Sequence, residues 1–487
     1  GQETMFPEHS PLIGLGHVIP QEMQNIRQLT VDISSAELEA LESAKQMAQM
    51  LLEELAHESA DRLVAYRHFQ RWVPRYQPVK VTEPKTEPFR QNGVYVITGG
   101  AGMIGWMIGN YLAKHYQATI AIIQRSFPVK QEWEGWLAEH GEKDERSKRI
   151  REMMDAEQAG GTIEVYRAQV DDYLQMSNAM AKIEAAHGTI HGVFHCAANM
   201  GDHFFHAIDQ LNEELCQAIF QPKMDGVLVL DQILEQKSLD FCLLMSSTAA
   251  VLGGYGFAAY AAANVFMDAY TNKRNRQRSV KWKTIDWEAW RSREKAEARY
   301  QSSIGDLTMT PEEGIEALRR VLSMDRLHHL VHSPGDLEAR LDQWIRFLDN
   351  PAGKTNAAAM PKSARQKRKS TSAMVDYEKP SNHVEQKIAE IWETFLGIEE
   401  ISTNDNFFEL GATSLTLIRI KSLLEEEFHK SIPIVDLFAN PTIASLAKSI
   451  QADENGADGE GEAKRLKERE VTGRELLARQ AELRKRE

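Results

Sequence analysis

Short apolar runs alternate with amphipathic segments of helical period between Gly93 and about Leu330. These runs are predicted as buried strands, at Val94–Ile97, Thr119–Ile123, Ile163–Gln169, Gly192–His195, Phe241–Met245, Lys281–Ile285 and 329–331. Strands separated by helices are typical of a parallel sheet that is covered on both faces. The pattern therefore predicts an α/β fold with a doubly wound parallel sheet.

The N-terminal part has a simpler pattern. Residues 1–90 contain one long helical repeat that is predicted to start at Ser34–Leu38. Two short runs, Leu63–Arg67 and Arg71–Tyr76, predict a hairpin. Further along, the polar segment from Trp287 to Thr310 is a candidate lid.

The C-terminal part is predicted to be helical between linkers. Residues 383–450 have helical spacing throughout, and the polar stretches 351–380 and 451–462 flank them. Residues 463–487 alternate basic and acidic side chains with few apolar ones. That last segment is either a solvated helix or a docking helix for another chain, and the sequence favours neither.

Composition narrows the classes of partner. The chain has 487 residues and a net charge of -14, which disfavours nucleic acid as a main partner. Its three cysteines are not at metal-ligand spacing, so no metal site is expected, and their low number fits a reducing compartment. No apolar run approaches the roughly 18 residues of a membrane span, and the N-terminus lacks signal-peptide order. We expect a cytoplasmic protein without a membrane partner.

A glycine-rich loop follows the first strand of the predicted sheet. Residues 98–105 read TGGAGMIG, with Gly-x-Gly-x-x-Gly between a strand and an amphipathic helix. Such a turn lets backbone amides and the helix N-terminus approach a pyrophosphate. The candidate dinucleotide contacts are Gly99, Gly100, Gly102, Met103, Ile104 and Gly105.

The next strand ends in Gln124, Arg125 and Ser126. An acidic residue there would suit a ribose hydroxyl, whereas an arginine suits a 2′-phosphate. We therefore predict NADPH rather than NADH, with contacts from Arg125 and Ser126. The alternative is that Arg125 is only a solvated surface residue.

Three polar residues have the spacing of a carbonyl-reducing site. Ser247 ends an apolar run, Tyr260 follows thirteen residues later, and Asn264 lies one helical turn further on. A phenol beside a hydroxyl can give a developing alkoxide a proton and a hydrogen bond. Ordinary short-chain dehydrogenases carry Tyr-x-x-x-Lys on one helix, but position 264 is asparagine here, so a lysine must come from elsewhere, and Lys223 is the candidate.

The strings PKMDG, SS and YAAAN, which contain Lys223, Ser247 and Tyr260, resemble the ketoreductase domain of modular polyketide synthases and animal-type fatty acid synthases. That family exchanges the positions of lysine and asparagine. The resemblance implies a short-chain-dehydrogenase type of Rossmann fold at 91–350, preceded at 1–90 by a degenerate structural subdomain. The chain starts partway into that subdomain, which is consistent with a piece of a longer protein.

The resemblance also implies residue roles. Tyr260 would protonate the ketone, Ser247 would hydrogen-bond its oxygen, and Asn264 would position Lys223 or a water. Lys223 would lower the pKa of the tyrosine and hold the cofactor ribose. For each residue alone, a structural role is the alternative. Further cofactor contacts are expected from Gln169, Val170 and Ala197, and the stereochemical markers of the family do not assign the alcohol's configuration here.

The string NFFELGATSL, residues 406–415, resembles the phosphopantetheine attachment motif of carrier proteins. The resemblance implies a small all-α, four-helix acyl carrier domain at 381–452, with the arm on Ser414. The alternative is that Ser414 is only a helix N-cap. Its predicted helices are Ile388–Leu396, Ser414–Phe428, Pro433–Ala439 and Thr442–Ile450.

Together these features predict NADPH-dependent reduction of a β-ketoacyl thioester held on 4′-phosphopantetheine, in polyketide biosynthesis. Implied partners are ketosynthase and acyltransferase domains, a phosphopantetheinyl transferase and, through 463–487, a downstream module. Two alternatives stay open: a silent reductase scaffold beside a working carrier, and a free-standing dehydrogenase of small ketones.

Overall fold

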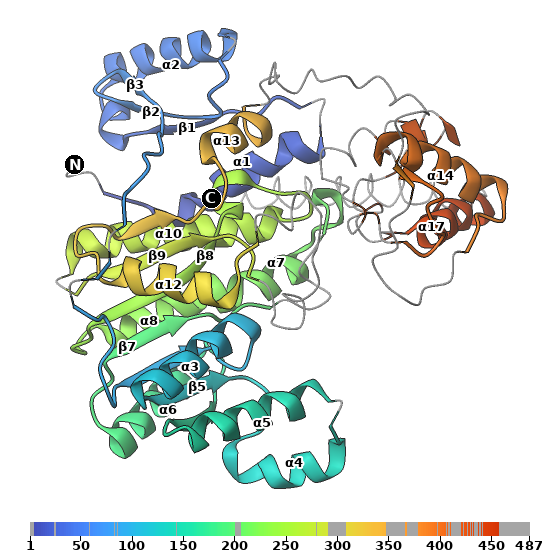
Figure 1. Ribbon diagram of the computed structural model, residues 1–487. Coiled ribbons are helices and arrows are strands. Elements are labelled where there is room, and N and C mark those ends of the chain that lie inside the picture. Colours follow the sequence, from blue (N-terminus) through green and yellow to red (C-terminus); the bar gives the residue numbers. More distant parts are fainter. Residues whose placement is uncertain are drawn as a thin grey trace, which may run out of the picture. The chain divides into compact units, whose positions relative to one another are not determined.

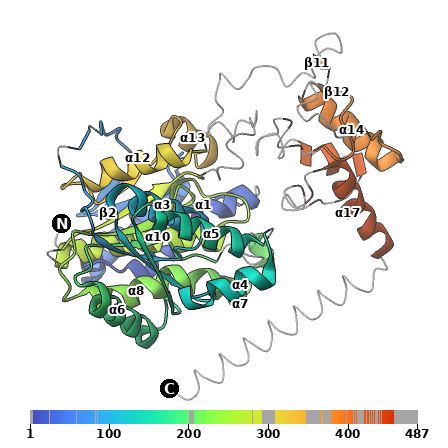
Figure 2. The ribbon, with the colours of Figure 1, turned by 60° about the horizontal axis from the view of Figure 1, so that its bottom comes forward.

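The computed structural model describes residues 4–346, apart from 24–25, 58, 82, 85, 143, 200–205, 279 and 291–307. Beyond these it describes 366–367, 378–396, 398–405 and parts of 407–456. Contacts divide the chain into two compact units, one made of residues up to 355 except 301–303, and the other of the remainder. Figures 1 and 2 show the elements of both units.

The first unit is built on a seven-stranded sheet in which every neighbouring pair is parallel. The strand order is β10-β9-β8-β7-β4-β5-β6. The strands are β4 (Val94–Thr98), β5 (Thr119–Gln124), β6 (Thr162–Arg167), β7 (Gly192–His195), β8 (Phe241–Ser247), β9 (Trp282–Trp287) and β10 (His329–Val331). The predicted doubly wound sheet is confirmed, with strand ends moved by at most two residues.

Helices cover both faces of this sheet (Figure 2). They are α3 (Met103–Tyr116), α4 (Trp133–His140), α5 (Glu145–Gln158), α6 (Tyr173–His187), α7 (Glu213–Phe220), α8 (Gly226–Leu234), α9 (Ala249–Leu252), α10 (Ala258–Gln277), α12 (Pro311–Leu322) and α13 (Leu337–Trp344). Alternate strand residues enter opposite cores, as the twofold period of a strand requires. In β4, Ile97 packs with α3 and α12, whereas Val96 packs with α6 and α8.

The N-terminal segment contributes one helix to the large sheet and a second, smaller sheet. Helix α1 (Pro11–Glu22) packs on α10, so closely that a Cβ on Gly14 would lie 2.5 Å from the backbone nitrogen of Ala262. The smaller sheet has the order β1-β2-β3, made of β1 (Thr30–Ile33), β2 (Leu63–Arg67) and β3 (Gln70–Trp72). The predicted hairpin is confirmed because β2 and β3 pair antiparallel, but its second strand ends at Trp72 and does not extend to the predicted Tyr76.

The predicted helix start at Ser34–Leu38 is wrong. A 3₁₀ turn occupies Ser35–Leu38, and helix α2 runs from Leu41 to Ala56. The side chain of Ser34 makes no capping bond to this turn. Local sequence therefore indicated the helix but not its first residue.

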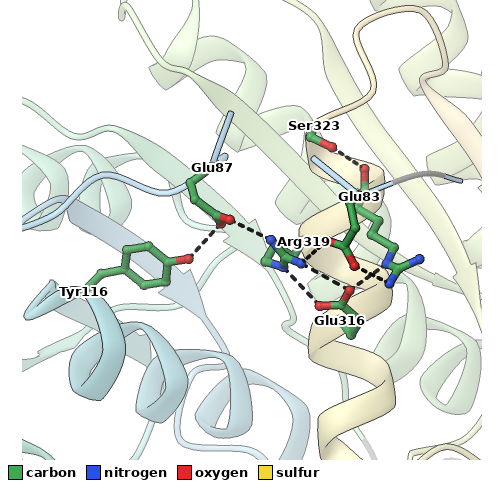
Figure 3. A network of polar contacts seen from close by, with 7 residues as sticks. Glu83, Glu87, Tyr116, Glu316, Arg319 and Ser323 are labelled. Atoms are coloured by element: carbon green, nitrogen blue, oxygen red, sulfur yellow. Dashed lines mark hydrogen bonds and ion pairs between the residues drawn. The ribbon is translucent and has the colours of Figure 1, made fainter. Parts of the chain in front are cut away.

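A network of ion pairs fixes the segment between the two sheets (Figure 3). Arg319 of α12 reaches Glu83 and Glu87, at 2.6 Å in each case, and also pairs with Glu316. Glu87 in turn accepts a hydrogen bond from the hydroxyl of Tyr116, at the end of α3. The connecting segment is thus held to two helices of the large sheet.

The second unit has a small core of its own. Its described elements are α14 (His383–Leu396), α17 (Ile443–Gly456) and the paired strands β11 (Gln366–Lys367) and β12 (Ile398–Glu399). Trp392 stacks on Phe407 with ring centroids 3.7 Å apart. The first and last predicted helices are confirmed, but α17 continues six residues into the predicted linker at 451–462. Ser414 and residues 463–487 lie outside the described residues.

None of the helices in the described part of the chain is both long enough and apolar enough to cross a membrane.

Candidate active site

The glycine-rich loop lies at the point where the strand order reverses. Strand β4 has β7 on one side and β5 on the other, which is where doubly wound folds bind nucleotides. Gly99 has a φ of +67°, and a Cβ there would lie 2.8 Å from the Cα of Ala197. Gly105 lies against Gly100, where a Cβ would come within 2.8 Å of the Cα. Both positions therefore require glycine.

The first turn of α3 offers free amide donors beside this loop. Gly102 is the N-cap of the helix, and the first bond within the helix runs from the amide of Trp106 to the carbonyl of Gly102. The amides of Met103, Ile104 and Gly105 therefore point out of the helix start, as N-terminal amides do. A Cβ on Gly102 would meet only the carbonyl oxygen of Gly99. This loop fits a dinucleotide pyrophosphate.

The other predicted cofactor residues lie at the same edge of the sheet. Arg125 and Ser126 follow β5 and are exposed, and Arg125 forms no ion pair with any residue the structure describes. Gln169 is exposed after β6, next to the buried Val170. Ala197 follows β7 and packs on Gly99. The structure thus brings all the predicted cofactor residues to the carboxyl ends of neighbouring strands.

Lys223 comes from an unusual helical turn. Residues Gln221–Asp225 form a π-helical segment between α7 and α8, and this segment contains Pro222, which has no backbone N–H to donate. Lys223 is only 3% exposed. Its ammonium donates to Asn264 Oδ1 at 2.9 Å and to the carbonyl oxygen of Met245 at 3.2 Å. A π-turn at this position was not predicted from the sequence.

The four predicted catalytic residues come together. Ser247 ends β8, and Tyr260 and Asn264 lie on α10. Lys223 Nζ lies 5.1 Å from the centre of the Tyr260 ring. Asn264 is fully buried and donates its amide to the carbonyl oxygen of Tyr260, so it links the lysine to the helix that carries the tyrosine.

The ionisable groups of this cluster have shifted pKa values. Burial raises the pKa of Tyr260, and hydrogen bonds with the side chains of Ser247 and Asn264 oppose the rise. Burial lowers the pKa of Lys223 to about 8, against an attraction from Asp268. Burial is the largest cause and leaves the pKa of Tyr260 above its ordinary value, and the expectation that Lys223 lowers this pKa stays a prediction.

Two residues that the sequence did not single out hold the loop before Tyr260. Gln21 donates to the carbonyl oxygen of Leu252 at 2.7 Å and accepts from the amide of Gly254 at 2.8 Å. Glu22 accepts from the amide of Gly256, also at 2.8 Å. Both lie at the end of α1, so the N-terminal helix helps to shape the entrance to α10.

Comparisons with known proteins agree with this fold and site. Residues 93–292 match the family described as KR domain, and residues 386–450 match the phosphopantetheine attachment site. The ketoreductase domain from the bacillaene assembly line has a TM-score of 0.57 at 23% identity, over 70% of this chain and 77% of that one. The A-type ketoreductases from a modular polyketide synthase have a TM-score of 0.57 at 20% identity, over 72% and 69%.

Curated relatives include polyketide synthases. Polyketide synthase PksM of Bacillus subtilis (strain 168) is 28% identical over 81% of this chain, which spans 9% of its length. Polyketide synthase PksN of the same strain is 24% identical over 93% of the chain, which spans 8% of its length. The first unit thus matches the KR domain model and has the fold of polyketide synthase ketoreductases. The chain as a whole carries a KR domain followed by a phosphopantetheine attachment domain, as in a ketoreductase and carrier didomain of a polyketide synthase.

Proposed function

We propose that this chain reduces a β-ketoacyl thioester to the β-hydroxyacyl thioester, with NADPH as reductant and the acyl chain carried on a phosphopantetheine arm at Ser414. The observation that carries the proposal is the contact between Lys223, Asn264 and Tyr260 beside Ser247, at the same sheet edge as the glycine-rich loop. The first unit supplies the reducing site, and the second supplies the tether.

The chain's own residues account for the proton half of the reaction. A bound nicotinamide cofactor supplies the hydride that forms the new C–H bond. Tyr260 gives its hydroxyl proton to the ketone oxygen as the carbonyl π bond breaks, and Ser247 donates a hydrogen bond to the same oxygen. Lys223, held by Asn264 and the carbonyl oxygen of Met245, places a positive charge beside the phenolate that forms.

Cofactor choice rests on the end of β5. Arg125 is exposed and Ser126 follows it, so both can meet a ribose phosphate laid across the glycine-rich loop. Gln169, Val170 and Ala197 would border the rest of the dinucleotide. Arg125→Ala should lower kcat/KM for NADPH about tenfold, a loss typical of one charge-assisted contact, and leave the value for NADH nearly unchanged. Equal losses with both cofactors would remove Arg125 from this role.

The carrier part of the proposal rests on the match at residues 386–450, which includes Ser414. The proposed division is a structural subdomain at 1–90, a catalytic domain at 91–350, a linker at 351–380 and a carrier at 381–452. A covalent tether would raise the local concentration of acyl substrate at the reductase. Partners would be a phosphopantetheinyl transferase and other polyketide synthase domains, with 463–487 as a candidate docking segment.

One experiment tests both halves of this proposal. A phosphopantetheinyl transferase loads the full chain with a defined β-ketoacyl group, NADPH is added, and the carrier-bound product is identified by mass. We expect a gain of two hydrogens on Ser414-linked acyl chains, and no loading of Ser414→Ala. Loading without reduction, together with no NADPH oxidation on a small β-ketothioester, would favour the silent-scaffold alternative. Equal reduction rates for free and tethered substrates would favour the free-standing dehydrogenase.

A further inference from the structure

A second cluster of ionisable side chains lies one helical turn beyond Asn264. Asp268 of α10 and Asp286 of β9 are buried, at 6% and 0% exposure, and His329 of β10 lies against both. His329 Nε2 is 3.0 Å from Asp286 Oδ2 and 3.8 Å from Asp268 Oδ2. One potential ligand atom from each residue lies within 4.8 Å of the others.

The register of the sheet explains why residues so far apart in the sequence meet. Strand β10 pairs with β9 so that His329 is opposite Thr284, two residues before Asp286. Thr284 and Asp286 point to the same face because alternate strand residues do. The hydroxyl of Thr284 donates to Asp268 Oδ1 at 2.7 Å, which fixes α10 over this face.

Charge counting connects the cluster to the catalytic lysine. Two carboxylates and one imidazolium leave a single negative charge, and Lys223 carries a single positive charge whose hydrogen-bond partners, the oxygens of Asn264 and Met245, are neutral. Buried charges are costly unless they are compensated. Together the four groups are neutral when all are ionised, and the largest attraction that opposes desolvation of Lys223 comes from Asp268, ahead of Cys196.

We propose that Asp268 is a positioning residue which keeps Lys223 charged from one turn beyond Asn264 on α10, and that His329 and Asp286 set how much charge Asp268 carries. The inference rests on the proposed function, because it assigns Lys223 a charge-dependent role. The cluster is thus a device for tuning the reductase rather than an ion pair that only holds strands together.

The pKa directions agree with this geometry. Burial and the neighbouring Asp286 raise the pKa of Asp268, while His329 lowers it. Burial lowers the pKa of His329, but the two carboxylates outweigh burial and raise it to about 10. Removal of the imidazolium should therefore neutralise Asp268, whereas removal of the Asp286 charge should favour its ionisation.

Other titratable groups face this region from several elements. Burial raises the pKa of Tyr76, in the segment after β3, and both Asp286 and Asp268 raise it further. Tyr76 therefore stays neutral and adds no charge below about pH 10. Among the described residues, further ionisable neighbours are Tyr260, Cys196 and His195 beside Lys223, and Glu338 and Arg346 beside Tyr76.

The test compares Asp268→Asn with Asp286→Asn, two variants that each remove one carboxylate of the cluster. In profiles of kcat/KM against pH with NADPH and a small β-ketothioester, the basic limb reports Lys223. Asp268→Asn should move that limb down by about one pH unit, because the supporting charge is lost. His329→Gln should move it in the same direction, and Asp286→Asn should leave it in place or move it up. Equal shifts for Asp268→Asn and Asp286→Asn, or no shift for either, would overturn the proposal.

A second measurement does not depend on turnover. Coupling between two ionisable groups is reciprocal, so removing the charge of Lys223 should make Asp268 more protonated and lower the pKa of His329. NMR titration of histidine-labelled full chain, with His329→Gln to assign the resonance, should show a lower His329 pKa in Lys223→Met. An unchanged His329 titration would refute the coupling. An inactive wild-type chain with an intact coupling would instead refute only the proposed reductase function.

Discussion

Two buried ionisable side chains in the first unit differ in the partners that surround their charges. Glu54, on the helix over the small sheet, is 6% exposed and accepts hydrogen bonds from two nitrogens of Arg71 and from the hydroxyl of Tyr66. Lys223, in the π-helical turn between α7 and α8, is 3% exposed and donates to two neutral oxygens.

The consequences for ionisation differ accordingly. Arg71 is the main cause that lowers the pKa of Glu54, so folding favours its charged form. Burial lowers the pKa of Lys223 to about 8, so folding disfavours its charged form. A buried charge that has a charged partner and filled hydrogen-bonding positions stabilises a fold. A buried charge with only neutral partners costs stability, and it persists where catalysis uses it. The same unit thus holds one buried charge with a charged partner and one with neutral partners, and we assign the catalytic role to the second.

Removal of the functional charge should have the largest effect. We expect Lys223→Met to lower kcat/KM for reduction by about 10²- to 10⁴-fold, the range of acid–base assistance, while the fold is kept. Steady-state kinetics with a small β-ketothioester measure this loss.

A matched control is Lys283→Met on strand β9, which pairs with β8. Lys283 is also buried, and its ammonium donates to backbone carbonyl oxygens at the end of α12, among them that of Val321. That variant should lose stability but keep the turnover number of its folded fraction. A comparable loss of turnover in both variants would remove the distinction between the two lysines.

Stability and activity should respond to pH in opposite directions. The folded pKa of Lys223 is about 8 and its ordinary value is 10.5. Below pH 8 the buried ammonium therefore lowers the free energy of unfolding. Between pH 8 and 10.5 the folded chain has lost the Lys223 proton while the unfolded chain still holds it. The free energy of unfolding therefore rises over this window, by up to about 3 kcal/mol. Over the same window, reductase activity should fall as the cation is lost.

Urea unfolding of wild type and Lys223→Met at several pH values isolates this contribution, because other titrating groups are common to both. The unfolding free energy of wild type relative to the variant should rise from pH 8 to 10.5. A fall over that window would contradict the assignment of an undercompensated charge.

Removal of the structural charge should have a smaller effect, and only on stability. Glu54→Gln should cost about 2 kcal/mol of unfolding free energy at neutral pH, because Arg71 loses a charged partner. The folded pKa of Glu54 is lowered, so its contribution is present above its ordinary pKa and is lost as the pH falls through the folded value.

Denaturant unfolding of both chains between pH 3 and 7 should therefore converge at the acid end. The control is Glu42→Gln on the same helix, an exposed glutamate paired with Lys45, which should change stability by less than about 0.5 kcal/mol. Equal costs for the two glutamates would mean that burial of Glu54 does not matter.

The sequence predicted most of the fold because local pattern determines most of it. Strands β7 and β10 were predicted to the residue, and Ser247, Tyr260 and Asn264 were recognised by spacing along one strand and one helix. The features that the sequence did not predict depend on contacts between segments far apart in the chain. Nothing local indicates that α1 packs on α10, apart from Gly14, where the backbone of Ala262 leaves no space for a side chain.

The site was predicted less completely than the fold. Lys223 was the candidate because position 264 is not a lysine, and the family resemblance supported it, but its π-helical turn has no sequence pattern beyond Pro222. Desolvation, which raises the pKa of Tyr260 and lowers that of Lys223, depends on packing density that spacing does not reveal. The meeting of His329 with Asp268 follows from strand register, which the sequence leaves open.

The central claim is that Tyr260 gives its proton to a ketone. The most direct test follows NADPH oxidation by the full chain with a β-ketothioester, for wild type and for Tyr260→Phe, while NADPH binding is measured by fluorescence titration. We predict that the phenylalanine variant binds NADPH with nearly unchanged affinity and has lost turnover by about 10³-fold. A variant that retains substantial turnover would contradict the account.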